Sequence, residues 1–185
     1  FFSVNSDIFL RTLCLVSVSV FFTSTGAGEG EVILAVNTLL MQFFTLFSYV
    51  MDGFAYAGEA LTGRYVGAND FLMLRRLIRL LFRWGFGLSI LFTLLYAFNG
   101  NAFIALLTDD EVVVAVSQEY YYWALAIPLA GFSAFIWDGI FIGATATRYM
   151  LFSMLIASVS FFIMFYFLHN QWANHALWAS FIVYL

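Results

Sequence analysis

Long apolar runs leave this chain few ways to fold. The hydrocarbon core of a bilayer is about 30 Å thick and takes roughly 20 helical residues to cross. Helices fit the runs better than barrel strands, because no run keeps the apolar and polar alternation that a barrel strand needs. We therefore predict an all-α, polytopic membrane helix bundle with five full transmembrane helices and a truncated sixth. The predicted spans are about 9–26, 32–60, 77–98, 113–144, 150–168 and 172–185.

Composition supports the membrane assignment. Hydrophobic residues make up 64% of the chain and charged residues only 10%, whereas soluble domains are about a quarter charged. A soluble chain this poor in charge could not cover its apolar surface. We therefore expect the lipid bilayer to be a partner. The net charge of -4 and the absence of a basic patch argue against nucleic acid as a partner.

Cysteine and histidine give no sign of redox or metal chemistry. Cys14 is the single cysteine, which excludes an internal disulfide, and its spacing to His169 and His175 fits no metal-ligand motif. We expect no cofactor and no metal centre. The chain starts without Met and stops inside an apolar run, so we expect a fragment of a longer protein.

Polar breaks separate the predicted spans, and their charges differ by side. Breaks are expected at 26–31, 63–70, 99–102 and 169–175. The seven basic residues fall on one side: Arg11 lies at the entry of the first span, Arg148 lies between the fourth and fifth, and the others surround the connection between the second and third, at Arg64, Arg75, Arg76, Arg79 and Arg83. The opposite connections carry only acids, at Glu29, Glu31, Asp109, Asp110, Glu111 and Glu119. Because cytoplasmic loops retain Lys and Arg, we predict that the N-terminal end is cytoplasmic.

Polar residues share one face of the second predicted span. Asn37, Thr45, Ser48 and Asp52 recur at steps of three, four or seven, which places them on the same side of a helix. An ionisable group inside a bilayer is costly unless it meets a partner or a water-filled cavity. These four residues are therefore candidates for lining a cavity or coupling an ion. Interhelical packing explains the three uncharged ones equally well.

The fourth predicted span repeats the pattern. Its stretch WDGIFIGATATRYM places Asp138, followed by glycine, at a depth similar to that of Asp52, which is also followed by glycine. Asp138 is a candidate for ion coupling, or else a structural ion-pair partner of Arg148. Glu59 lies close to Arg64 and is a candidate for an ion pair at the cytoplasmic end.

A proline interrupts the fourth predicted span. Pro128 removes a backbone hydrogen bond, and Gly131 lies one turn further along. These two residues are hinge candidates, although a kink in a membrane helix is as often a fixed packing feature.

Two stretches carry a resemblance to a known family. The connection GEALTGRYVGAND, the stretch WDGIFIGATATR and the order of spans resemble the C-terminal half of the multidrug and toxic compound extrusion (MATE) transporters, in the branch named for DNA-damage induction. The resemblance covers essentially the whole chain. It implies a multi-pass protein of the bacterial inner membrane that exports small organic, often cationic, substrates by alternating access. Such proteins are antiporters coupled to protons or sodium, with two six-helix lobes around a central cavity.

The resemblance also implies roles for particular parts of the chain. Residues 1–185 would form the C-terminal transmembrane lobe, and the missing N-terminal lobe would be its partner. In the sodium-coupled branch, an acid on the fourth helix of this lobe joins an acid on its first helix. Asp138 matches the former, but there is no acid between Thr12 and Gly26. The coupling ion, proton or sodium, therefore stays open.

Other functions fit parts of the pattern. A lipid-linked flippase of the same superfamily would need more basic residues facing its cavity. An intramembrane aspartyl protease would use Asp52 and Asp138 as paired carboxylates, but the residues around them do not resemble the motifs of such proteases. A structural membrane subunit without transport activity is a third alternative. We expect a transporter and not an enzyme.

Overall fold

The computed structural model describes the backbone of residues 2–185 and the side chains from residue 5 onward. Over this range the chain forms helices and no strands. The helices are α1 (Phe2–Gly28), α2 (Glu31–Gly67), α3 (Phe71–Leu107), α4 (Glu111–Gly143), α5 (Thr147–Trp172) and α6 (Asn174–Tyr184). Five of them, α1 to α5, are long and apolar enough to cross a membrane. The predicted all-α class is confirmed, with α6 as the short sixth helix.

The stretch GRYVGAND ends one helix and starts the next. Helix α2 runs on to Gly67, so that only residues 68–70 connect it to α3. Asn69 has a φ of 54°, in the left-handed region that asparagine tolerates better than most residues. The side chain of Asp70 then accepts a hydrogen bond from the backbone nitrogen of Met73 at 3.0 Å and caps α3. Helix end, turn and cap are thus all encoded locally.

The break predicted at 99–102 is wrong. These residues lie inside α3, and the connection to α4 follows at 108–110. Gly100 is there for packing, because any Cβ at this position would overlap the side chain of Tyr121. The hydroxyl of Tyr121, on α4, donates to the backbone carbonyl of Tyr96, which lies on α3 with Gly100. Asparagine and glycine in this stretch therefore reflect contacts between helices rather than a loop.

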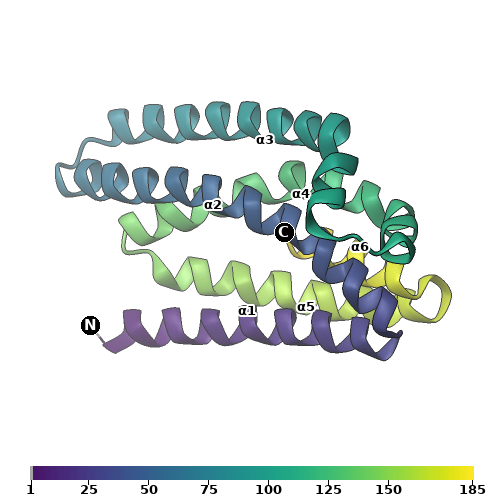
Figure 1. Cartoon of the computed structure of the whole chain (residues 1–185). Coiled ribbons are helices and arrows are strands. Elements are labelled where there is room, and N and C mark those ends of the chain that lie inside the picture. The colour runs from purple at the N-terminus through teal and green to yellow at the C-terminus, as the bar shows by residue number, and fades with distance from the viewer. Residues whose placement is uncertain (1) are drawn as a thin grey trace.

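The helices pack in two groups, one of α2, α3 and α4 and the other of α1, α5 and α6. Helix α2 packs most extensively against α4, and α3 contacts both of them. On the other side α5 packs against α1 and α6 (Figure 1). Large side chains such as Phe43, Phe47 and Ile136 are fully buried between the elements. The interface between the two groups is where the candidate site lies.

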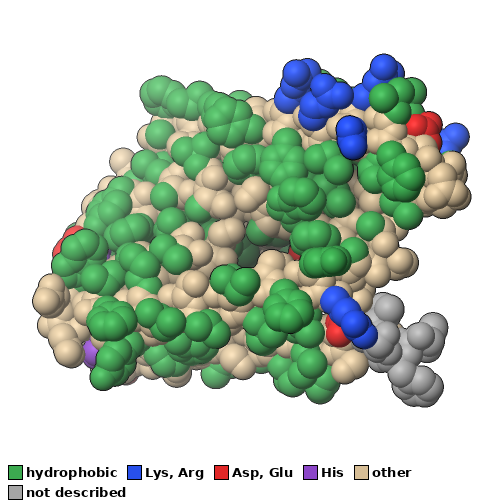
Figure 2. All heavy atoms as spheres, turned by 180° about the vertical axis from the view of Figure 1, so that it is seen from behind, with side chains coloured by type: hydrophobic (Ala, Val, Ile, Leu, Met, Phe, Trp, Pro, Cys, Tyr) green, Lys and Arg blue, Asp and Glu red, His purple; other side chains and the backbone are tan. Residues whose placement is uncertain are grey.

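The surface is apolar over most of its length, with charges at the ends. Figure 2 shows hydrophobic side chains spread over one face, most of the basic side chains at one end and histidine at the other. Helices α2 and α3 each have 37 residues, which is about 55 Å at 1.5 Å per residue. That exceeds the thickness of the hydrocarbon core, so their arginine-bearing ends extend beyond it.

Candidate functional site

Helices α2 and α4 touch through their backbones at two glycines of α4. A Cβ at Gly139 would overlap the carbonyl group of Ala55, and one at Gly143 would overlap the carbonyl group of Glu59. Small residues four apart allow membrane helices to approach this closely. Asp138 directly precedes the first of these glycines, so the crossing carries Asp138 toward α2.

Asp138 and Asp52 come together at this crossing. Asp52 lies about one turn before Ala55 on α2, the helix that this crossing holds against α4. Both side chains are partly buried. Two carboxylates at close quarters repel each other unless a cation or a proton lies between or beside them. The two Asp-Gly steps noted in the sequence therefore lie on helices that meet at this crossing, and we refer to Asp52, Asp138 and Arg11 as the charged cluster.

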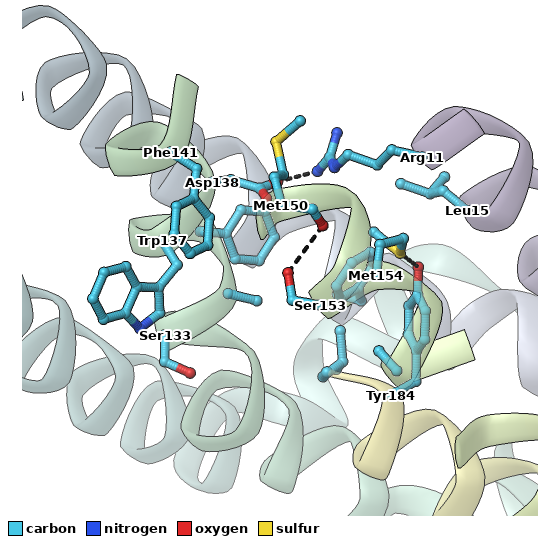
Figure 3. A pocket seen from close by; sticks show the side chains of 15 residues that line it. Arg11, Leu15, Ser133, Trp137, Asp138, Phe141, Met150, Ser153, Met154 and Tyr184 are labelled. Carbon is cyan, nitrogen blue, oxygen red and sulfur yellow. Dashed lines mark hydrogen bonds and ion pairs between the residues drawn. The ribbon is translucent and has the colours of Figure 1, made fainter. Parts of the chain in front are cut away.

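A cavity of about 450 Å³ opens beside Asp138, bounded mainly by α1, α4, α5 and the end of α6 (Figure 3). Aromatic and thioether side chains form most of its wall, and Asp138 and Arg11 are its charged residues. The aromatic ones are Phe44, Phe135, Trp137, Phe141 and Tyr184, and the thioethers are Met150 and Met154. An apolar wall with a few convergent polar groups is typical of small-molecule sites.

Arg11 of α1 points at Asp138 of α4 (Figure 3). Its terminal Nη2 donates to Oδ2 of Asp138, forming an ion pair between residues 127 positions apart. The Nε of Arg11 is buried and has no hydrogen-bond partner in the described part of the chain. The Arg11 guanidinium therefore balances the charge of Asp138 through a single nitrogen–oxygen contact rather than a bidentate one.

This geometry corrects the ion pairs expected from the sequence. Arg148 does not pair with Asp138, because α4 ends at Gly143 and Arg148 lies beyond the turn, on α5, where its side chain is exposed. Within residues 5–185, Glu59 and Arg64 form no ion pair either. They are five positions apart, whereas neighbouring side chains on a helix surface are three or four positions apart.

Arg11 is the site residue that sequence reasoning missed. The charge pattern of the sequence groups it with the arginines at the cytoplasmic ends of the spans. A usable signal existed, because Arg11 lies inside the predicted span 9–26, and an arginine inside a span needs an acid or a cavity nearby. Which acid that would be could not be read from the sequence.

A second polar contact lies at the same end of α1. The hydroxyl of Thr147, at the start of α5, donates to Oδ2 of Asp7 at 2.9 Å. Arg11 sits one turn further along the same helix. The start of α1 is therefore held by one side chain to α5 and by another to α4.

Asn37, a predicted cavity-lining residue, lies elsewhere. Its amide exchanges two hydrogen bonds with the amide of Asn174, at 2.8 and 2.9 Å, and its Oδ1 also accepts from Nε1 of Trp178 at 2.8 Å. All three residues are buried. This network joins α2 to α6, and it corresponds to the packing interpretation of Asn37.

Thr45 and Ser48 satisfy their hydroxyls within their own helix. Thr45 donates to the carbonyl of Met41 at 3.1 Å, and Ser48 donates to the carbonyl of Thr45 at 2.8 Å. Neither residue lines the cavity beside Asp138. Of the polar face predicted on α2, Asp52 is the member that the structure brings to the charged cluster.

The predicted hinge residues are both buried in α4. Helix α4 continues through Pro128, which cannot donate a backbone hydrogen bond. The hydroxyl of Thr93 on α3 donates to the carbonyl of Leu125 at 3.3 Å, close to the carbonyls that a proline leaves free. Gly131 lies next to Leu185 at the end of the chain. Whether this segment bends during function stays a prediction.

A second titratable cluster lies at the opposite end of the bundle. Nδ1 of His175 accepts from Nε1 of Trp123 at 3.2 Å, and its Nε2 lies 3.5 Å from Glu119. Glu29, in the connection between α1 and α2, is nearby. Burial raises the pKa of the Glu29 carboxyl above its ordinary value, against the opposing influence of His169 and His175. This cluster is remote from the cavity that Asp138 lines.

Comparison with known proteins identifies the family. Residues 8–168 match the family described as MatE. The chain belongs to the MatE family. This MatE chain is 37% identical to the DNA damage-inducible protein F of Escherichia coli (strain K12), over 99% of this chain and 40% of that protein. It is 22% identical to Protein DETOXIFICATION 42 of Arabidopsis thaliana, over 96% of this chain and 35% of that protein. The resemblance noted in the sequence is thereby confirmed.

The MatE chain spans well under half the length of these curated relatives. No solved structure matches it. Family membership and the apolar helices make it a multi-pass membrane protein.

Proposed function

We propose that this chain is one lobe of a multidrug efflux antiporter. A second lobe of the same protein would face it, and the two would export small organic cations by alternating access while a proton or sodium ion moves inward. Membership of the MatE family and the five apolar helices support this function. The arginines at one end of the bundle support a bacterial inner-membrane topology with the N-terminal end in the cytoplasm.

The observation that carries the proposal is that Asp138 lies in the wall of an apolar cavity, with Arg11 as its ion-pair partner. Ionisable residues inside a membrane segment are costly and mark ion or substrate pathways by default. Coupling requires a carboxylate that can release one cation and accept another. The ion pair of Asp138 with Arg11, a side chain from a different helix, supports such a role.

A lipid-linked flippase is less well supported. Holding a diphosphate would take several cationic groups around the cavity. In the part of the chain described, the wall carries one arginine, and that arginine is already paired with Asp138. An aspartyl protease is disfavoured as well, since Oδ2 of Asp138 contacts Arg11 instead of sharing a proton with Asp52.

The test uses Asp138→Asn in the full-length protein. Efflux of a fluorescent organic cation from everted vesicles, energised in turn by a proton and by a sodium gradient, should be abolished in this variant. Arg148→Gln, which removes a charge from the same end outside the cavity, should keep wild-type efflux. The gradient that drives the wild type identifies the coupling ion.

A double variant separates coupling from structure. Asp138→Asn leaves Arg11 without its partner, so part of any defect could come from lost stability. Combining it with Arg11→Gln removes both charges and should restore thermal stability without restoring efflux. Efflux at the wild-type rate in either Asp138→Asn protein would reject the proposed role of this residue.

A further inference from the structure

The charged cluster at the α2 and α4 crossing contains more negative than positive charge. Asp138 and Asp52 lie on the two helices of this crossing, and Arg11 is the cation that contacts Asp138. Within residues 5–185, Asp52 makes no side-chain hydrogen bond or ion pair, and Arg11 contacts one of the two oxygens of Asp138. The cluster can therefore bind a second cation. An anion would find its one positive group, the guanidinium of Arg11, already paired with Asp138.

Arg11 is held in a way that allows exchange. Arginine binds a carboxylate most strongly when two nitrogens contact two oxygens, but here one nitrogen contacts one oxygen. Its Nε is buried without a partner, and a buried unpaired donor carries a desolvation penalty. The cavity beside the ion pair gives the long arginine side chain room to swing away.

The wall around Asp138 suits an apolar cation. Rings of Phe44, Phe135, Phe141 and Tyr184 surround the cavity, and the faces of aromatic rings attract cations. The flexible thioether of Met154 lies against the hydroxyl of Tyr184 at 3.2 Å and can adapt to ligands of different shape. A cation with an aromatic body would thus match both the wall and the charge.

We propose that Arg11 is a tethered competitor that occupies Asp138 while the cavity is empty and that a cationic substrate must displace. This inference rests on the proposed efflux function and adds a specificity-determining residue to it. Arg11 neutralises Asp138, so it lowers the affinity for every cation, and it leaves the affinity for neutral ligands of the same shape almost unchanged. The residue therefore sets how strongly the cavity discriminates by charge.

Two probes of matched shape test this role, namely tetraphenylphosphonium and neutral triphenylphosphine oxide. Their dissociation constants are measured by calorimetry with the full-length protein in lipid nanodiscs. In Arg11→Gln, the preference for the cation over the neutral probe should rise on the order of tenfold, because a unit positive charge within a few ångströms of the ligand is removed. Arg11→Lys should keep the wild-type preference, and so should the matched control Arg148→Gln.

Asp138→Asn provides a second measurement that does not depend on the stability of the Arg11 variants. It should reduce the preference for the cation below the wild-type value, and more strongly while Arg11 is present than in combination with Arg11→Gln, because the unpaired guanidinium repels a cation. A purely structural role for Arg11 would change the affinities for both probes alike.

An unchanged preference in Arg11→Gln would overturn the inference, and so would the failure of both probes to bind any of the proteins. These results are distinguishable from failure of the proposed function. If the preference shifts but no gradient drives efflux by the wild type, efflux is rejected and the role of Arg11 stands. If efflux occurs and the preference stays fixed, the role of Arg11 is rejected alone.

Discussion

The backbone contact between α2 and α4 can be tested with one methyl group. A Cβ at Gly139 would overlap the carbonyl oxygen of Ala55, a backbone atom that no rotamer change can move. Gly139→Ala must therefore push the helices apart. Gly53 provides the matched control, because it also follows an aspartate in a span but a Cβ there has nothing within 4 Å.

The two substitutions should have opposite effects on the free energy of unfolding. Overpacking a well-packed contact costs about 1–3 kcal/mol, so Gly139→Ala should lower stability by that amount. Where space is available, alanine stabilises a helix over glycine by about 0.5–1 kcal/mol, so Gly53→Ala should raise it slightly. The expected gap between the variants is about 1.5–4 kcal/mol.

Reversible unfolding in mixed micelles, titrated with a denaturing detergent and followed by circular dichroism, measures this gap. Separation of the helices should also weaken efflux by Gly139→Ala, because Asp138 is the next residue along α4. If Gly139→Ala is as stable as the wild type, or if both alanine variants change stability by the same amount, the close crossing is refuted.

Two further predictions concern the ends of the bundle. The raised pKa of Glu29 means that its contribution to stability is present below its ordinary value of 4.5 and is lost as the pH rises through the higher folded value. Glu29→Gln should therefore raise the unfolding temperature at pH 7.5 but not at pH 4, and an equal gain at both would contradict this. For topology, Asp109→Cys in a Cys14→Ser background should react with an impermeant thiol reagent in intact cells, whereas Ala68→Cys should react only after permeabilisation. The reverse labelling would invert the proposed orientation.

The fold class was predictable because a bilayer requires each membrane-spanning helix to have a minimum apolar length. Apolar runs near 20 residues identified the membrane helices, and α1 to α5 are where those runs were placed. The helix ends were less predictable, as the stretch at 99–102 shows. Its glycine and asparagines are residues typical of loops, but Gly100 is needed in the helix because the side chain of Tyr121 occupies the space beside it.

The polar face of α2 shows why periodicity alone could not define a site. Periodicity shows that Asn37, Thr45, Ser48 and Asp52 point in similar directions, but it does not show which residues they contact. Asn37 meets an amide on α6, and the two hydroxyls bond to their own backbone. The sequence signal for the crossing is the glycine pair of α4, because four-residue spacing of glycines indicates a close helix crossing.

The sequence by itself determined that the chain crosses a membrane in helices, that its arginines collect at one end, and that Asp138 is an acid inside a span. These properties depend on neighbours along the chain and on the thickness and charge preferences of a bilayer. The partner of Asp138 was decided only by tertiary structure. Arg11 lies 127 residues away, and it reaches Asp138 because α1 packs on α5 while the glycines of α4 hold α4 against α2. A contact between side chains on separate helices depends on how those helices cross, and no periodicity within one helix carries that information.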